Sequence, residues 1–178
     1  MFRKIALVGY RATGKSTVAK RLSERLKTPV VDTDAAIEER VGKTVARIFQ
    51  EDGEPRFREI EAQVVAGFLN SPEPLILATG GGAPLCDTTR AEMKKNAVVV
   101  WLTASVETIA RRMLADSSTS SRRPSLTNAP SPVDEIESVL KFREPLYRDV
   151  ATFVVEVDGK TVDEIVEEIL RLAPDVLN

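Results

Sequence analysis

The chain has 178 residues, of which 43% are hydrophobic and 29% are charged, and its formal net charge is −2. This length and composition are typical of one folded domain with a sizeable core, and the charge excludes a basic surface for nucleic acid or anionic membranes. The chain contains no histidine, so a general base must be a carboxylate or, less often, a lysine, a tyrosine or a cysteine.

The first predicted strand leads directly into a phosphate-binding motif. Residues 5–8 (IALV) form a short apolar run, and residues 9–16 (GYRATGKS) match the P-loop pattern G-x-x-x-x-G-K-[ST]. A helix is expected from Lys15 to about residue 26. Backbone N–H groups at such a helix start can face an anion, while Lys15 reaches the outer phosphates and the Ser16 hydroxyl holds Mg²⁺. An ordinary glycine turn is the alternative, which the full pattern and both flanks disfavour.

The second predicted strand, residues 29–31, is followed by two acids, Asp32 and Asp34. Acids at the carboxyl end of a strand in an open α/β sheet lie on the side where ligands bind. One of them could instead cap the next helix, but we favour a functional role for the pair. Helices are then expected over residues 35–41, in a short stretch after Thr44, and after Pro55.

The helix after Pro55 carries four charged side chains, which lie mostly off its apolar face: Arg56, Arg58, Glu59 and Glu61. From the pattern alone, solvated surface charges are the better interpretation.

The third predicted strand, residues 75–79, is followed at once by Gly80, Gly81 and Gly82. Three glycines there favour a backbone that approaches a ligand closely over a merely flexible loop. A polar helix over residues 88–96 and a fourth strand over residues 97–102 come next. The helix that follows has Arg111 and Arg112 near its end.

Residues 116–132 are rich in Ser, Thr, Pro and Asn and include Arg122 and Arg123. This composition predicts a mobile flap that carries arginines over the phosphates, in preference to a linker. A helix over residues 133–147, broken near Arg143-Glu144-Pro145, and a fifth strand over residues 152–157 are expected next. A capping box, Thr161-Val162-Asp163-Glu164, opens the last helix. The alternation of strands and helices predicts an α/β domain with a parallel sheet.

Taken together, these motifs resemble the shikimate kinase family over nearly the whole chain, from about Ile5 to Leu172. The resemblance is carried by the P-loop, Asp32-x-Asp34, Phe57-Arg58-x-x-Glu61, Thr79-Gly80-Gly81-Gly82-Ala83, Arg123-Pro124 and Arg143-x-Pro145-Leu146-Tyr147. It implies a three-layer P-loop kinase fold, with a five-stranded parallel sheet, helices on both faces and a mobile lid. It also implies a single domain over residues 1–178, with a substrate-binding excursion at about 33–61 and a lid at about 115–131.

The function that this resemblance implies is ATP-dependent phosphorylation of the shikimate 3-hydroxyl, which gives shikimate 3-phosphate and ADP for chorismate and aromatic amino acid biosynthesis. The implied cofactors are ATP and Mg²⁺. The implied catalytic residues are Asp34, Lys15 and Arg123, and Arg122 is the immediate neighbour of Arg123. The implied nucleotide-binding residues are Ala12, Thr13, Gly14, Lys15, Ser16, Thr17, Arg112 and Arg123. The implied shikimate-binding residues are Asp34, Arg58, Gly80, Gly81, Gly82 and Arg143, and the implied Mg²⁺ residues are Ser16 and Asp32.

Ala12 is the main departure, because P-loops of the family usually have glycine at this position. The position either needs less backbone freedom than Gly14, or the loop is slightly shifted. The alternatives in function are another small-molecule P-loop kinase, such as a gluconate or nucleoside-monophosphate kinase, and a weakly active relative that binds nucleotide. We expect the protein to bind neither nucleic acid nor a membrane and to be a monomer. The lone Cys86 and the lack of a long apolar run or signal peptide favour the cytoplasm.

Overall fold

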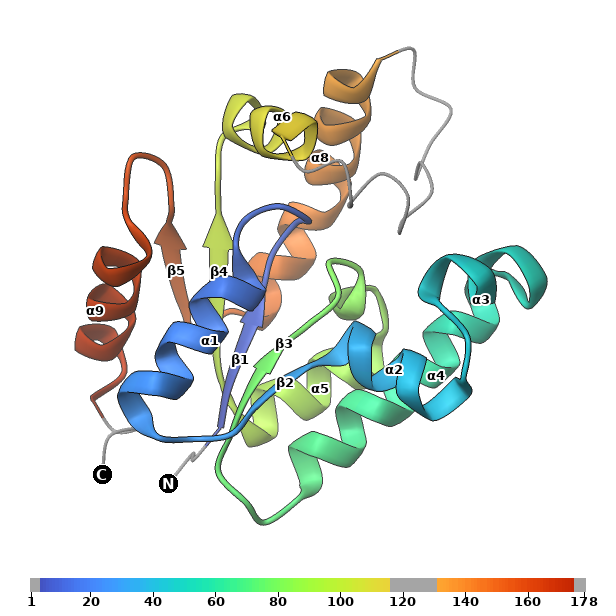
Figure 1. The fold of residues 1–178 in the computed structure, drawn as a ribbon, viewed down its shortest axis with the longest axis horizontal. Helices are drawn as coiled ribbons and strands as arrows, with labels where there is room; N and C mark the ends of the chain where they lie inside the picture. Colours follow the sequence, from blue (N-terminus) through green and yellow to red (C-terminus); the bar gives the residue numbers. More distant parts are fainter. Residues whose placement is uncertain (1–3, 116–130, 175–178) are drawn as a thin grey trace.

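A five-stranded parallel sheet forms the middle of the computed structural model, which describes residues 4–115 and 131–174 (Figure 1). The strand order is β2-β3-β1-β4-β5, and every pairing is parallel. The strands are β1 (Lys4–Val8), β2 (Val30–Asp32), β3 (Leu75–Ala78), β4 (Val98–Thr103) and β5 (Phe153–Glu156). The sheet that the sequence predicts is therefore confirmed, with strand ends shifted by about one residue.

Helices cover both faces of this sheet. On one face lie α1 (Lys15–Leu26) and α9 (Val162–Leu172), and on the other lie α4 (Gly53–Asn70), α5 (Asp87–Asn96) and α8 (Pro132–Val150). Alternate residues of β1 supply the two cores: Ile5 and Leu7 pack with α1 and α9, whereas Ala6 and Val8 pack with the other layer. Because both faces are covered, the strands are continuous apolar runs. The three-layer α/β architecture is confirmed.

The sheet has a point at which neighbouring strands send their connections to opposite faces. Strands β1 and β3 are hydrogen-bonded neighbours. The chain leaves β1 through α1 on one face and leaves β3 through α5 on the other. In open α/β sheets, the crevice at such a switch point is where ligands bind, outside the carboxyl ends of the strands. The P-loop follows β1, and the three glycines follow β3, so both lie at this crevice.

Two short helices and the start of α4 extend the fold beyond one edge of the sheet. These are α2 (Thr33–Val41) and α3 (Val45–Glu51), which lie beside the amino-terminal half of α4 in Figure 1. They enclose an apolar cluster of their own, formed by Ile37, Val45, Ile48, Phe57, Ile60 and Val64. Gly42, in the left-handed conformation at φ 73°, ends α2. This extension covers the region in which the sequence predicts a substrate-binding excursion.

Helix α8 corrects one prediction, because it runs unbroken from Pro132 to Val150 with Pro145 inside it. The predicted break near Arg143-Glu144-Pro145 is wrong. A proline inside a helix removes one backbone hydrogen bond. Here the buried side chains of Tyr147 and Val150 pack into the sheet core on the far side of that point and hold the helix together. The predicted lid at about 115–131 lies almost entirely outside the described residues.

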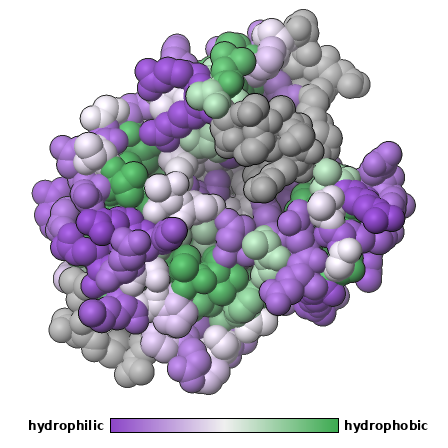
Figure 2. Space-filling view, in the orientation of Figure 1, coloured by the Kyte–Doolittle hydropathy of each residue, from purple (hydrophilic) through white to green (hydrophobic). Residues whose placement is uncertain are grey.

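The last helix begins as the sequence predicts. The Thr161 hydroxyl accepts from the backbone N–H of Glu164, whose carboxylate accepts in return from the N–H of Thr161, which makes a complete capping box. In the space-filling view, the described surface of this face is mostly hydrophilic, with small separate hydrophobic areas (Figure 2). No helix in the described parts of the chain is both long and apolar enough to cross a membrane.

Candidate active site

The P-loop forms a turn between β1 and α1 that is closed by its own lysine. The ammonium group of Lys15 donates to the carbonyls of Gly9 and Tyr10, at 2.8 Å each, and the Thr13 hydroxyl also donates to Tyr10 at 2.8 Å. Among the described residues, no side chain caps α1 and no acid lies in its first turn. The N-terminal N–H groups of α1 and the positive end of its dipole are therefore open to an anion. Gly14 forms the cap of this helix, and Thr17 is exposed in its first turn.

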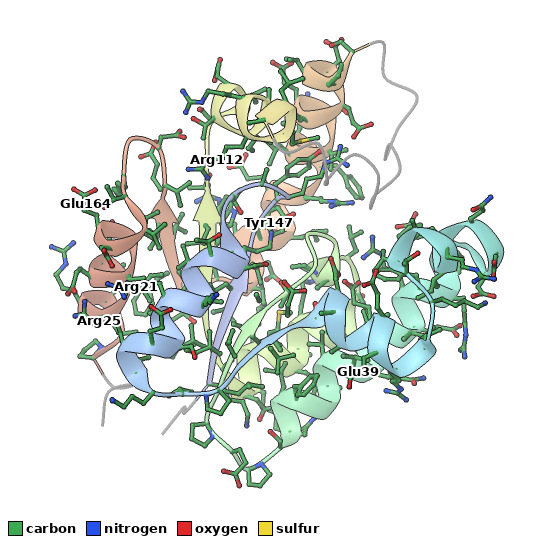
Figure 3. All side chains as sticks on the ribbon, viewed as in Figure 1. Arg21, Arg25, Glu39, Arg112, Tyr147 and Glu164 are labelled. Carbon is green, nitrogen blue, oxygen red and sulfur yellow. The ribbon has the colours of Figure 1, made fainter. Side chains whose placement is uncertain are left out.

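Ala12 takes a left-handed backbone conformation, with φ at 63°. This value lies in the small left-handed region that non-glycine residues can adopt, whereas Gly14, at φ 96°, lies outside it, so position 12 needs less backbone freedom than Gly14. A left-handed conformation costs a non-glycine residue on the order of 1–2 kcal/mol, because Cβ approaches the following carbonyl oxygen. The guanidinium of Arg112 reaches from α6 (Val106–Ala115) and donates to the Ala12 carbonyl at 3.2 Å (Figure 3). Arg112 therefore lies beside the P-loop, on the nucleotide side where the sequence predicts it.

Asp32 combines two roles that the sequence presents as alternatives. One carboxylate oxygen caps α2, since it accepts from the N–H of Asp34 at 3.0 Å and of Ala35 at 3.4 Å. The other oxygen accepts from the Ser16 hydroxyl at 2.6 Å. A hydroxyl and a carboxylate side by side are hard oxygen ligands, which suit Mg²⁺. The described residues contain no group of three acidic, Cys or His side chains that could hold a metal ion, but Mg²⁺ keeps several waters and needs few protein oxygens. The pair fits the ion.

A second site, which we call the acceptor pocket, opens beside the P-loop. It is lined by Arg11, Asp34, Val45, Phe49, Phe57, Arg58, Glu61, Gly80, Gly81, Gly82 and Arg143. Every residue that the sequence predicts for substrate binding is in this set. Phe49 and Phe57 form an aromatic pair with ring centroids 4.6 Å apart, and the Arg58 guanidinium lies 5.1 Å from the Phe57 centroid. The pocket thus has one apolar wall and several charged groups, a composition typical of a site for a small polar ligand.

Two of the three glycines after β3, Gly80 and Gly82, are required because side chains from other elements lie against their backbone, and the P-loop backbone lies close to Gly81. A Cβ on Gly80 would lie 2.6 Å from a carboxylate oxygen of Glu61 and 2.9 Å from one of Asp34, and a Cβ on Gly82 would lie 2.4 Å from two nitrogens of Arg58. None of the three has a positive φ. Close approach, not an unusual backbone conformation, therefore explains the triple glycine.

Arg58 and Glu61 form a buried ion pair, and the prediction that both are solvated surface charges is wrong. Their side chains are only 18% and 2% exposed, and the two groups are 2.6 Å apart. Arg58 also pairs with Glu54 at 3.0 Å. By contrast, Arg56 and Glu59 of the same helix are exposed, as the sequence predicts. The pocket and the glycine loop cover one flank of α4, so charge and burial coincide there.

Burial raises the pKa of Glu61, although the positive charges of Arg58 and Arg143 act in the opposite direction. One of its oxygens has no hydrogen-bond partner among the described residues. Burial also opposes the charge of Arg58, but the neighbouring carboxylates of Glu61 and Glu54 outweigh this and raise the pKa of the guanidinium. Glu61 and Glu54 therefore keep Arg58 positively charged and fixed in position at the wall of the pocket.

Helix α8 brings Arg143 and Tyr147 to the other side of the glycine loop. The Tyr147 hydroxyl donates to the Gly81 carbonyl at 2.5 Å, and its ring stacks on Trp101. Burial raises the pKa of Tyr147 to about 12, so the phenol stays a donor at neutral pH. The buried Arg143 guanidinium lies 3.7 Å from where a Gly81 Cβ would be. Figure 3 shows Tyr147 pointing from α8 into the centre of the molecule. One turn of α8 thus supplies an arginine for the pocket and a tyrosine that holds its floor.

Two charged residues of the site have no role in the sequence prediction: Arg11, at a variable position of the P-loop motif, and Glu135, in the first turn of α8. They form a buried ion pair, and Arg11 also lines the acceptor pocket. The P-loop pattern leaves position 11 open and does not reveal this contact. Glu61, in contrast, had a sequence signal, since it lies one helical turn after Arg58 in the motif that carries the resemblance. The predicted catalytic Arg123 and its neighbour Arg122 lie outside the described residues.

The chain matches known proteins over nearly all of its length. The profile of one family, described as "Shikimate kinase", matches residues 11–173. The shikimate kinase of Rhodopirellula baltica is 40% identical over 168 residues, which is 94% of this chain and 89% of that protein. The solved shikimate kinase from Acinetobacter baumannii in complex with shikimate has a TM-score of 0.90 at 34% identity, and the match covers 98% of this chain and 94% of that one. A gluconokinase from Sinorhizobium meliloti has a TM-score of 0.65 at 20% identity, with 98% of this chain and 93% of that chain covered, and so shares the fold alone.

Proposed function

The chain belongs to the shikimate kinase family and phosphorylates shikimate with ATP, and we propose how its residues divide this reaction. The single observation that carries the proposal is the position of Asp34. It lines the same pocket as Arg58 and Arg143, and that pocket also includes Arg11 of the P-loop. An acceptor bound there lies next to the triphosphate on the loop.

The acceptor is oriented by its carboxylate and its hydroxyls. Arg58 and Arg143 are two guanidinium groups in one pocket, and a planar guanidinium binds a carboxylate through two parallel hydrogen bonds. With the carboxylate held there, the ring of shikimate lies along the apolar wall of Phe49 and Phe57. Its 3-hydroxyl faces Asp34, which orients this hydroxyl and accepts its proton. A carboxylate in this role suits a chain that has no histidine.

The nucleotide is held by the P-loop backbone, with Lys15 beside the β- and γ-phosphates. The N–H groups that open α1, together with that of Gly14, donate to the phosphate oxygens, while the N–H of Thr13 donates to the Tyr10 carbonyl at 3.4 Å. Phosphoryl transfer needs in-line positioning and neutralisation of charge more than covalent chemistry. Ser16 and Asp32 are the residues that would hold Mg²⁺, which supplies neutralisation of the phosphate charge when bound.

Further parts of the proposal rest on the resemblance to the family. Arg123 acts as the catalytic lid arginine, and the lid at about 115–131 closes over the phosphates and excludes water. Arg112 stacks on the adenine; its place beside Ala12 supports this. We also propose that the chain acts as a monomer in the cytoplasm, and gel filtration coupled to light scattering tests the first of these points.

The test is release of ADP from ATP and Mg²⁺ with a panel of acceptors: shikimate, quinate, gluconate and nucleoside monophosphates. Turnover with shikimate should exceed that with every other acceptor. Turnover with another acceptor, but not with shikimate, would overturn the proposal. Omission of Mg²⁺ in the same assay should abolish turnover, and replacement of Mg²⁺ by Na⁺ at equal ionic strength controls for screening.

A further inference from the structure

The crest of the P-loop, residues 10–12, is fastened to the helices α6 and α8. The Tyr10 side chain is buried in an apolar cluster between these helices, with Ile109 on α6 and Ile136 and Val139 on α8. Arg112 of α6 donates to the Ala12 carbonyl. The guanidinium of Arg11 pairs with the carboxylate of Glu135 on α8. Three consecutive loop residues are thus each held from outside the loop.

The Arg11–Glu135 pair is buried, as is Arg58–Glu61, whereas most ion pairs among the described residues are exposed. Its two side chains are 10% and 7% exposed, and they come from positions 124 residues apart. Exposed pairs, such as Arg21–Glu24 on α1, contribute little to stability. A buried pair fixes geometry strongly, because loss of one partner leaves a buried charge uncompensated. The pair is therefore placed to fix the position of the loop relative to α8.

The residue next to this pair is the one in the unfavourable backbone conformation. Ala12, at φ 63°, would relax to an ordinary conformation if the crest were free to move. Relaxation would rotate the peptide groups on either side of it and redirect the N–H groups that face a phosphate. A glycine adopts this conformation at no steric cost, whereas an alanine adopts it only at a cost in free energy, which outside support can offset.

We propose that Arg11 and Glu135 are positioning residues for the nucleotide. Their ion pair holds Ala12 in the left-handed conformation, so that the loop is already arranged to receive the phosphates. The ion pair stabilises a backbone conformation that a glycine at this position would adopt without strain. The inference rests on the proposed function only in that nucleotide binds at the P-loop.

The test measures binding of ADP with Mg²⁺, by calorimetry, to four proteins: the unsubstituted chain, Glu135→Gln, Ala12→Gly, and the double variant. With Ala12 present, Glu135→Gln should weaken ADP binding about fivefold to tenfold; with glycine at position 12, the same substitution should weaken it about twofold or less. Equal weakening in both backgrounds, or no weakening with Ala12, would overturn the proposal. A purely structural role for the pair would not depend on residue 12.

Because one buried charge is left behind, Glu135→Gln could unfold the chain, and a second variant avoids this. Arg11→Met with Glu135→Met removes both charges at similar volume and should show the same dependence on residue 12. Glu137→Gln, on the exposed face of the same helix turn, is the matched control and should show no such dependence. Because the readout is ADP binding, this test does not depend on shikimate turnover. A chain that binds ADP tightly but does not phosphorylate shikimate would overturn the proposed function, and the dependence of ADP binding on residue 12 would still decide this inference.

Discussion

The two halves of the active site are built in different ways. The nucleotide half is a continuous stretch, residues 9–16, in which Lys15 bonds to carbonyls of its own loop. The acceptor half collects side chains from α2, α4 and α8 around the glycine loop, and it keeps its arginines in place with buried carboxylates. The first half binds its ligand through the backbone of one stretch, which side chains of α6 and α8 hold in place, and the second binds its ligand through side chains from several helices. Substitutions should therefore affect one half without the other.

The largest effect is expected for Asp34→Asn, which keeps the shape of the side chain but removes its ability to accept a proton. The value of kcat should fall by about 10²–10⁴, while binding of ADP should change by about twofold or less. Steady-state kinetics and calorimetry on the same preparation measure the two quantities. Full activity in this variant would remove Asp34 from the mechanism.

Gly82→Ala should come next, because its Cβ would lie 2.4 Å from the Arg58 guanidinium and must displace it. We expect the KM for shikimate to rise about 30-fold, with the KM for ATP nearly unchanged. Gly67→Ala is the matched control, since Gly67 is in the last turn of α4 and nothing lies within 4 Å of its added Cβ. That variant should keep its activity and gain about 0.5–1 kcal/mol of stability. Similar kinetics for the two variants would show that close packing at Gly82 is irrelevant to the acceptor.

A smaller effect, with a pH signature, is expected for Glu61→Gln. Burial raises the pKa of Glu61, so this residue takes up a proton at a higher pH than an ordinary glutamate. Protonated Glu61 no longer attracts Arg58, and the KM for shikimate should rise as pH falls through that range. In Glu61→Gln the KM should be about tenfold higher at neutral pH and should lack this rise. Glu59→Gln, which alters an exposed pair, is the control.

The raised pKa of Glu61 also predicts how the stability of the folded chain depends on pH. Since the pKa of Glu61 is higher in the folded chain than in the unfolded one, the folded state binds this proton more tightly. The contribution of Glu61 to stability is therefore greatest at low pH and is lost as pH rises through the interval between the two pKa values. In Glu61→Gln this part of the pH dependence of unfolding should vanish. An unchanged pH dependence would contradict the assigned shift.

The comparison also explains how far the sequence predicts the molecule. The five strands and the P-loop are predictable because their signals lie within a few consecutive residues. The fold and the residues that line the pocket are predicted with them, and Asp34, Arg58 and Arg143 line one pocket as expected. These are features for which local pattern and family motif agree.

What the sequence does not predict are contacts that depend on tertiary packing. Helical periodicity divides α4 into an apolar and a polar face, but it does not show that the glycine loop covers Glu61 on the polar flank. The P-loop pattern does not specify the residue at position 11, so it does not predict the contact of Arg11 with Glu135, which lies 124 residues away in the sequence. Pro145 signals a break, and burial of Tyr147 overrides that signal.

The most direct test of the central claim, that the two halves bind their ligands through separate groups, is a comparison of Arg58→Lys with Ser16→Ala. Calorimetry would measure the Kd of each variant for shikimate alone and for ADP with Mg²⁺ alone. Arg58→Lys loses the guanidinium fork and should weaken shikimate binding about tenfold, with ADP binding changed by about twofold or less. Ser16→Ala should do the reverse, because it removes a proposed Mg²⁺ ligand. Equal weakening of both ligands in Arg58→Lys would contradict the account and assign Arg58 to the fold.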